Sequence, residues 1–181
     1  MHNDRRKFLT AVGLGLSGSA LASPFSLFDE RRLKMEFAFK AEVFVDKVMD
    51  IGITQHGNRR IIPITGGSFE GPAIKGTIVP GGADWQIIRA DGVAELEARY
   101  TLHTHDGALI YVVNKGYRHG PAEVMQRLAK GEAVDPEEYY FRTTPVFETS
   151  VARYNWLTKH IFIASGDRKP GSVLIDFYKL L

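Results

Sequence analysis

Residues 93–117 read VAELEARYTLHTHDGALIYVVNKGY, two runs of alternating apolar and polar residues on either side of a short Asp-Gly turn. Successive side chains of a β-strand point to opposite faces of a sheet, and two alternating runs joined by Asp-Gly are a strong hairpin signal. The stretch therefore predicts antiparallel strands at 93–104 and 108–117. One face of the first strand would carry Leu96, Ala98, Tyr100 and Leu102, and the other Glu97, Arg99, Thr101 and His103.

Further strands are predicted on both sides of this hairpin. Residues 36–46 alternate with period two, and the apolar face would carry Phe37, Phe39, Ala41, Val43 and Val45. Shorter strands are expected at 59–65, 69–79, 85–89, 139–144, 147–152, 161–164 and 173–178, with turns at 80–84 and 90–92. Sharp turns or bulges are expected at Gly66, Gly67, Gly81 and Gly82. One helix is predicted at 121–130, and many short strands with a single helix indicate an all-β barrel or sandwich.

The N-terminus has the features of an export signal. Arg5 and Arg6 precede an apolar, glycine-containing stretch, and Ala20-Leu21-Ala22 follows as a small-x-small cleavage site. This order is that of a secretory signal peptide, and the paired arginines mark the twin-arginine version. The apolar run is shorter than the roughly 20 residues that a membrane-spanning helix needs. We therefore expect residues 1–22 to be removed by the twin-arginine machinery, with no permanent membrane span and a periplasmic or secreted product.

Composition excludes several classes of protein. The chain has no cysteine, so disulfides, thiolate catalysis and cysteine-ligated metal sites are ruled out. Loss of residues 1–22 removes three of the 23 basic and one of the 21 acidic residues, leaving 20 of each. A nucleic-acid-binding protein needs a basic face to neutralise phosphates, and a neutral mature chain argues against one.

Three familiar catalytic or ligand-binding patterns are only partly matched. Ser68 lies among glycines, but Glu70 stands where the nucleophile elbow needs the second glycine of G-x-S-x-G. Lys75-Gly76-Thr77 reverses the Gly-Lys order of a phosphate-binding loop, and no helix is predicted after it. His103 and His105 could face one metal from a strand, but the second lies at the hairpin turn, which favours two solvated histidines. No metal or cofactor is therefore expected.

The chain resembles the DUF3237 (UPF0311) family in the order and spacing of several motifs. These motifs are IIPITGGSFEGP at 61–72, GTIVPGGADWQ at 76–86, ARYTL at 98–102, DGALIYV at 106–112, YFRT at 140–143, FET at 147–149 and YNWL at 154–157. The resemblance covers residues 36–181 and implies a small closed antiparallel β-barrel, similar to lipocalin-like barrels, with one short helix. The expected organisation is a signal peptide at 1–22, a lead-in segment at 23–35 and a barrel domain at 36–181.

Charged and aromatic residues within these motifs are the candidate site residues. We hypothesise that several of them meet at one barrel mouth, because inward charges must be paired or hydrogen-bonded. Arg99 or Arg142 would clamp a carboxylate or enolate oxygen, and Glu70 or Asp84 would accept a proton. Aromatic stacking on a ligand would come from Trp85, Tyr100, Tyr140 and Trp156. A structural alternative stays open, in which Arg99 pairs with Glu97 or Glu70 on the sheet surface and Asp84 caps a turn.

Three classes of function are compatible with this hypothesis. The first is a barrel that binds a small aromatic or oxygenated organic molecule, because closed barrels commonly hold one small ligand. The second is a cofactor-independent isomerase, cyclase or lyase in which a carboxylate base works with Arg and Tyr. A third, weaker class is a structural or assembly module without a ligand. Homo-oligomer formation is left open by the sequence.

Overall fold

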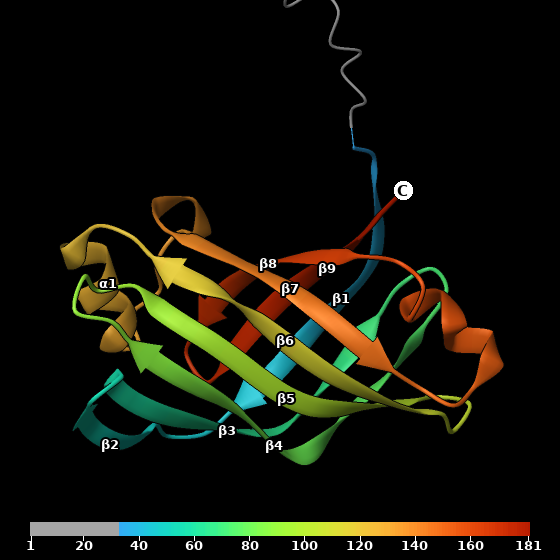
Figure 1. Ribbon diagram of the computed structural model, residues 1–181, viewed down its shortest axis with the longest axis horizontal. Coiled ribbons are helices and arrows are strands. Elements are labelled where there is room, and N and C mark those ends of the chain that lie inside the picture. The colour runs from blue at the N-terminus through green and yellow to red at the C-terminus, as the bar shows by residue number, and fades with distance from the viewer. Residues whose placement is uncertain (1–32) are drawn as a thin grey trace, which may run out of the picture. The chain divides into compact units, whose positions relative to one another are not determined.

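The computed structural model describes residues 33–181, and the predicted signal peptide and most of the lead-in segment lie outside the described residues. The strands are β1 (Met35–Val45), β2 (Met49–Thr54), β3 (Gly57–Glu70), β4 (Lys75–Ile88), β5 (Ala94–Thr104), β6 (Leu109–His119), β7 (Tyr140–Glu148), β8 (Phe162–Lys169) and β9 (Ser172–Leu180). One α-helix, α1 (Ala122–Ala129), and two short 3-10 helices, η2 (Pro136–Glu138) and η3 (Ala152–Leu157), connect them (Figure 1). No helix among residues 33–181 has the length and apolar character to cross a membrane.

The strands form a closed antiparallel barrel, which confirms the predicted fold. Neighbouring strands pair in the order β1-β9-β8-β7-β6-β5-β4-β3-β2, and an additional pairing between β1 and β3 closes the ring. Eight strands therefore make the barrel, and β2 pairs only with the first part of β3, beyond the end of β1. Figure 1 shows α1 and β2 at one end of the barrel and η3 at the opposite end.

The structure corrects the sequence prediction at two bulged segments. Residues 80–84, predicted as a turn, lie within β4, and the β4–β5 register shifts between Val79 and Ala83. The predicted inward face of β1 is wrong at Phe37, because a register shift between Phe37 and Phe39 turns this side chain outward and buries Ala38 instead. A bulge adds one residue to a strand, so it reverses the facing of everything beyond it.

Other predicted boundaries moved for identifiable reasons. The predicted strands 139–144 and 147–152 are one strand, β7, followed by η3. Pro145 is compatible with a continuous β7 because β8 pairs only at Arg142 and Thr143, so no ladder on that side needs its missing N–H. The predicted strand 69–79 is divided by the turn after Glu70, and β2 was not anticipated.

Glycine is required at the seam where β1 meets β3. Gly67 pairs with Val43 and has a φ of 139°, a conformation that other residues rarely adopt. A Cβ atom at this position would overlap the carbonyl oxygen of Glu42 on β1. The β3–β4 register shifts between Ile64 and Ser68, beside Gly67. Beyond this shift β3 pairs with β4 on one side and with β1 on the other, so Gly67 lies where the ring is closed.

The barrel interior is filled unevenly along its length. A large cluster of buried residues includes Phe39 and Phe177, whose rings stack at 4.3 Å. Tyr154 from η3 is fully buried in the same cluster, and its hydroxyl donates to Asp106 in the β5–β6 turn at 2.8 Å. A smaller cluster lies under α1 and contains Leu96, Leu128 and five further residues: Ala94, Val124, Val134, Tyr139 and Phe141. Between the two clusters, several polar side chains face the interior.

Candidate functional site

A small cavity lies inside the barrel between the two apolar clusters, and a few polar side chains project from its mostly apolar wall. Its walls include the apolar side chains of Val43, Ile64 and Leu96, and they also carry seven polar side chains: Asp84, Gln86, Tyr100, Asn114, Arg118, Thr143 and Arg168. The space that it offers to the centres of water-sized molecules is about 40 Å³. About 10–15 Å³ of such space holds one water, so the cavity accommodates about three non-hydrogen atoms.

These polar groups lie at inward-facing positions of neighbouring strands. Asp84 and Gln86 come from β4, two residues apart on the inner face, and Tyr100 comes from the next strand, β5. Asn114 and Arg118 come from β6, four residues apart and therefore on the same face. The remaining two groups, Thr143 and Arg168, come from β7 and β8. Five consecutive strands of the barrel thus contribute polar side chains to the cavity.

Four buried polar atoms on the cavity wall lack a hydrogen-bond partner among the described residues. They are the Tyr100 hydroxyl, Asn114 Oδ1, Arg118 Nε and Thr143 Oγ1. Buried polar groups in folded proteins are almost always hydrogen-bonded, because an unpaired one costs free energy. Both donors and acceptors are included in this set. The cavity is therefore suited to a small polar group that can accept from Arg118 and exchange hydrogen bonds with the hydroxyls and the amide oxygen.

A hydrogen-bonded chain fixes the carboxylate on one side of the cavity. The Arg60 guanidinium donates from Nη2 to Gln86 Oε1 at 2.9 Å, and Gln86 Nε2 donates to Asp84 Oδ2 at 2.6 Å. The other oxygen, Oδ1, accepts from the backbone N–H of Glu97 at 3.0 Å. Burial raises the pKa of Asp84 above its usual value, and these hydrogen bonds only partly oppose that shift. Asp84 is thus held in place as a carboxyl group that ionises less readily than an exposed one.

Positive charge exceeds negative charge around the cavity. Burial and the nearby Arg168 guanidinium lower the pKa of Arg118 to about 10. Burial, followed by the charge of Arg60, also lowers the pKa of Arg168. Two guanidinium groups, of Arg118 and Arg168, therefore line the cavity with Asp84, the only acidic side chain among the described residues on its wall, and Arg60 adds a third positive charge behind Gln86. The Arg118 guanidinium also lies over the Phe141 ring, 5.6 Å from its centroid. An anion in the cavity would reduce the repulsion among the three arginines.

An open vestibule lies beside the cavity at the α1 end of the barrel. The space that it offers to the centres of water-sized molecules is about 580 Å³. Ile62, Arg118 and Arg168 line both spaces, so these side chains form the partition between them. Residues of α1, including Met125 and Leu128, form one wall of the vestibule. A ligand could therefore reach the cavity from this end by passing the two arginines.

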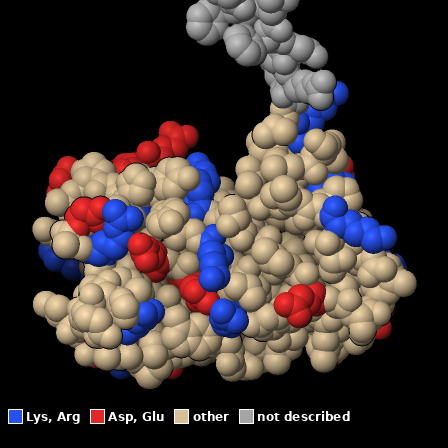
Figure 2. Space-filling model, in the orientation of Figure 1, with Lys and Arg blue, Asp and Glu red and all other residues tan. Residues whose placement is uncertain are grey.

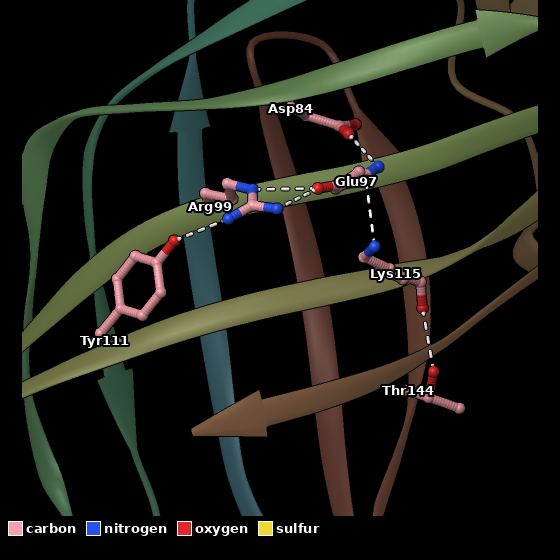
Figure 3. Close-up of polar contacts among 6 residues, drawn as sticks. All are labelled: Asp84, Glu97, Arg99, Tyr111, Lys115 and Thr144. Carbon is pink, nitrogen blue, oxygen red and sulfur yellow. Dashed lines mark hydrogen bonds and ion pairs between the residues drawn. The ribbon is translucent and has the colours of Figure 1, made fainter. Parts of the chain in front are cut away.

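Only two of the candidate site residues singled out from the sequence lie at this cavity. Asp84 and Tyr100 face the cavity, whereas Arg99 lies on the outer surface of β5. Figure 3 shows Arg99 donating to Glu97 and to the Tyr111 hydroxyl, with Lys115 on the other side of Glu97. The Arg99–Glu97 contact is the surface ion pair that the structural alternative described. Asp84 lies within β4 and caps no turn.

The other candidate residues lie outside the barrel interior. Trp85 is 36% exposed, and Tyr140 stacks on His119 with centroids 4.9 Å apart. Arg142 lies over the outer Tyr140 ring at 5.6 Å. Trp156 packs against the edge of the large apolar cluster.

Glu70 lines a separate open hollow that also includes His103 and His105. No group of three or more His, Asp or Glu side chains in residues 33–181 is arranged to hold a metal. The face in Figure 2 carries acidic and basic side chains interspersed, without one continuous basic stripe.

Six residues at the cavity were not anticipated from the sequence: Arg60, Gln86, Asn114, Arg118, Thr143 and Arg168. The facing of three of them was predictable from the sequence. Asn114 and Arg118 are in phase with the buried Ile110 and Val112, and Thr143 is in phase with the buried Phe141. A polar residue in the inward phase of an apolar strand is the pattern that would have found them.

Comparisons with known proteins agree with this architecture. Residues 33–180 match the family model described as protein of unknown function (DUF3237). A UPF0311 protein of Bradyrhizobium diazoefficiens is 46% identical over 149 residues, which cover 82% of this chain and 97% of that protein. A crystal structure of a conserved protein of unknown function from Rhodopseudomonas palustris is similar, with a TM-score of 0.81 at 43% identity over 83% of this chain and 99% of the other. A beta-barrel like protein from Acinetobacter baumannii gives a TM-score of 0.74 at 45% identity over 85% and 99% of the two chains.

Proposed function

The chain belongs to the DUF3237 family of proteins of unknown function, and on that premise we propose that its barrel binds a small oxygenated organic anion with the polar head group in the interior cavity. The observation that carries this proposal is the set of four unpartnered polar atoms on one cavity wall. A carboxylate, phenolate or enolate could accept from Arg118 and bond to the Tyr100 and Thr143 hydroxyls. Binding sites of this kind are mostly apolar with a few convergent polar groups, and the cavity has that composition.

The charge distribution supports an anion over a neutral or cationic ligand. Three arginines meet one carboxylate, and the pKa of each arginine is lowered by burial. Guanidinium groups are suited to planar oxygen pairs, which they bind through two parallel hydrogen bonds. The clamp that was assigned to Arg99 or Arg142 from the sequence therefore belongs, in this proposal, to Arg118 and Arg168.

A second candidate function is proton transfer to or from the bound ligand by Asp84. Burial raises the pKa of this carboxyl, and a general acid or base works best with a pKa near the working pH. Asp84 shares the cavity with Tyr100 and Arg118, which could stabilise negative charge on the ligand. Turnover of a bound ligand that is lost in Asp84→Asn, with binding retained, would distinguish this cofactor-independent enzyme from a binding protein.

The proposed binding is tested by thermal-shift and calorimetric screening of carboxylates and phenolates against neutral alcohols and amines. We expect stabilisation by anions only. Tyr100→Phe removes an inward hydroxyl and should weaken binding by about 2- to 10-fold, the effect of one neutral hydrogen bond. The matched variant Tyr111→Phe removes a hydroxyl on the outer surface and should leave the affinity unchanged. If no anion stabilises the protein, the structural or assembly role becomes the better interpretation.

We further propose that the chain is exported by the twin-arginine pathway, supported by Arg5, Arg6 and the Ala20-Leu21-Ala22 cleavage site. Replacing both arginines by lysine should abolish accumulation outside the cytoplasm, because the machinery reads the arginine pair and not its charge. Lys7→Arg, an equally conservative change beside the pair, should leave export intact. Immunoblots of cell fractions give the readout, and export of the double-lysine variant would contradict the proposal.

A further inference from the structure

The cavity and the vestibule differ greatly in size and lie on either side of the same two arginines. The cavity holds about three non-hydrogen atoms, which is the size of a carboxylate group. The vestibule is about 580 Å³ by the same measure. A ligand that places only its head group in the cavity must therefore place the rest of its body in the vestibule.

The walls of the vestibule are mostly aliphatic. Ile62, Ile88 and Ala94 come from the barrel, and Met125, Leu128 and Ala129 come from α1. No Phe, Tyr or Trp is among the described residues that line it, and the His119 imidazole, which does, is already stacked on Tyr140. The aromatic residues that could have stacked on a ring, Trp85 and Tyr140, lie on the outer surface. The vestibule thus favours a flexible aliphatic body over a stacked aromatic one.

The charges at the vestibule agree with an anionic head group. Arg118 and Arg168 stand between the two spaces. The one carboxylate at the rim, Asp91, is already paired with Arg89 at 2.5 Å. Asp91 therefore does not neutralise the two arginines, and the one described carboxylate on the cavity wall, Asp84, balances only one of their two charges.

We infer that the ligand of this site is an aliphatic carboxylate, with its carboxylate at Arg118 and Arg168 and its hydrocarbon body in the vestibule along α1. This inference rests on the proposed function and names the class of ligand. It makes α1 a specificity element as well as a packing element. Val124 and Leu128 are the buried side chains that fix the helix to the barrel, and Met125, Gln126 and Ala129 also face the vestibule.

The inference is tested by isothermal titration of the purified protein with butyrate, hexanoate and octanoate. Each methylene that enters an apolar site should tighten the dissociation constant by about fourfold. Octylamine, which has the same length but the opposite charge, should not bind. An affinity that is independent of chain length but still lost in Arg118→Met would overturn the inference and leave the proposed function standing. Absence of binding by all three acids would overturn the inference. The proposed function would then stand or fall with the result of the wider anion screen.

A gain-of-affinity variant separates the vestibule from general effects on the fold. Gln126 is exposed and lines the vestibule, so Gln126→Leu adds apolar surface where the hydrocarbon chain would lie. It should tighten octanoate binding by about threefold or more, with little change for butyrate. Glu123→Leu adds the same side chain on the same helix outside the vestibule. It also removes a negative charge, which acts equally on both acids, so the ratio of octanoate to butyrate affinity should not change. An equal change of that ratio in the two variants would place the hydrocarbon chain elsewhere and overturn the inference.

Discussion

Replacing Arg118 by methionine is expected to weaken binding of an anionic ligand by about 10- to 150-fold, the range for losing a hydrogen bond to a charged group. Arg118 lies on the partition between cavity and vestibule, and its Nε is one of the four unpartnered atoms. Methionine loses the cation–π contact with Phe141 but can pack its thioether against the same ring. Isothermal titration of both proteins with the best anion from the screen gives the ratio.

The same substitution should not destabilise the unliganded barrel. The pKa of Arg118 is lowered first by burial and then by Arg168, so the folded state holds this charge unfavourably. Removing it relieves that repulsion, and Asp84 keeps its bonds from Gln86 and the Glu97 amide. The melting temperature should therefore stay equal or rise, whereas Arg99→Met on the outer surface should change neither binding nor stability appreciably.

Two results would contradict this assignment of Arg118. Unchanged affinity in Arg118→Met would remove the residue from the binding site. A large loss of stability would show that its buried charge serves the fold. Arg168 on β8 lies between the cavity and the vestibule as Arg118 does. Arg168→Met should therefore also weaken anion binding while leaving the barrel folded.

Gly67→Ala is expected to be the most damaging small substitution in the barrel, with a loss of about 4 kcal/mol or more of unfolding free energy. Its φ of 139° disfavours any side chain, and the new methyl group would overlap the Glu42 carbonyl on the facing strand. The clash is with backbone, which cannot move without opening the seam that closes the barrel. At about 2–4 °C per kcal/mol, the melting temperature should fall by about 8–16 °C.

Gly81→Ala is the matched control for this prediction. Gly81 also has a positive φ, 106°, but a Cβ there would meet no atom within 4 Å. It should cost only the conformational penalty, about 1–2 kcal/mol. Circular dichroism melts of both variants give the comparison, and equal losses would mean that conformation alone, without the seam clash, explains Gly67.

The sequence predicted the strands better than the cavity because the two depend on different information. The alternation in residues 93–117 correctly predicted which side chains of β5 point inward, including Tyr100. The same alternation placed Arg99 on the opposite face. Grouping Arg99 with Tyr100 in one site gave more weight to residue type and motif membership than to strand phase. A one-residue difference in a strand separates the inside of a barrel from its outer surface.

The remaining site residues could not be found from local patterns alone. Arg118 and Arg168 are 50 positions apart and meet only because β6, β7 and β8 are neighbours in the closed ring. Arg60 reaches the same region from β3 through Gln86. Bulges add a further difficulty, because the register shift at Val79–Ala83 sets the facing of Asp84 and the residues after it. Such shifts depend on pairing across strands and not on the order of residues within one.

The first and last strands of the barrel are direct neighbours, with Met35 opposite Leu180. The ring therefore cannot close before β9 has been synthesised, because β9 is the last of its strands along the chain. Until then β1 and β8 both present open edges that other chains could pair with. Contacts between such distant parts of a chain also make folding slow. A nascent chain of this protein should thus depend on protection from aggregation until β9 is made, and truncation before residue 172 should leave it without a closed barrel.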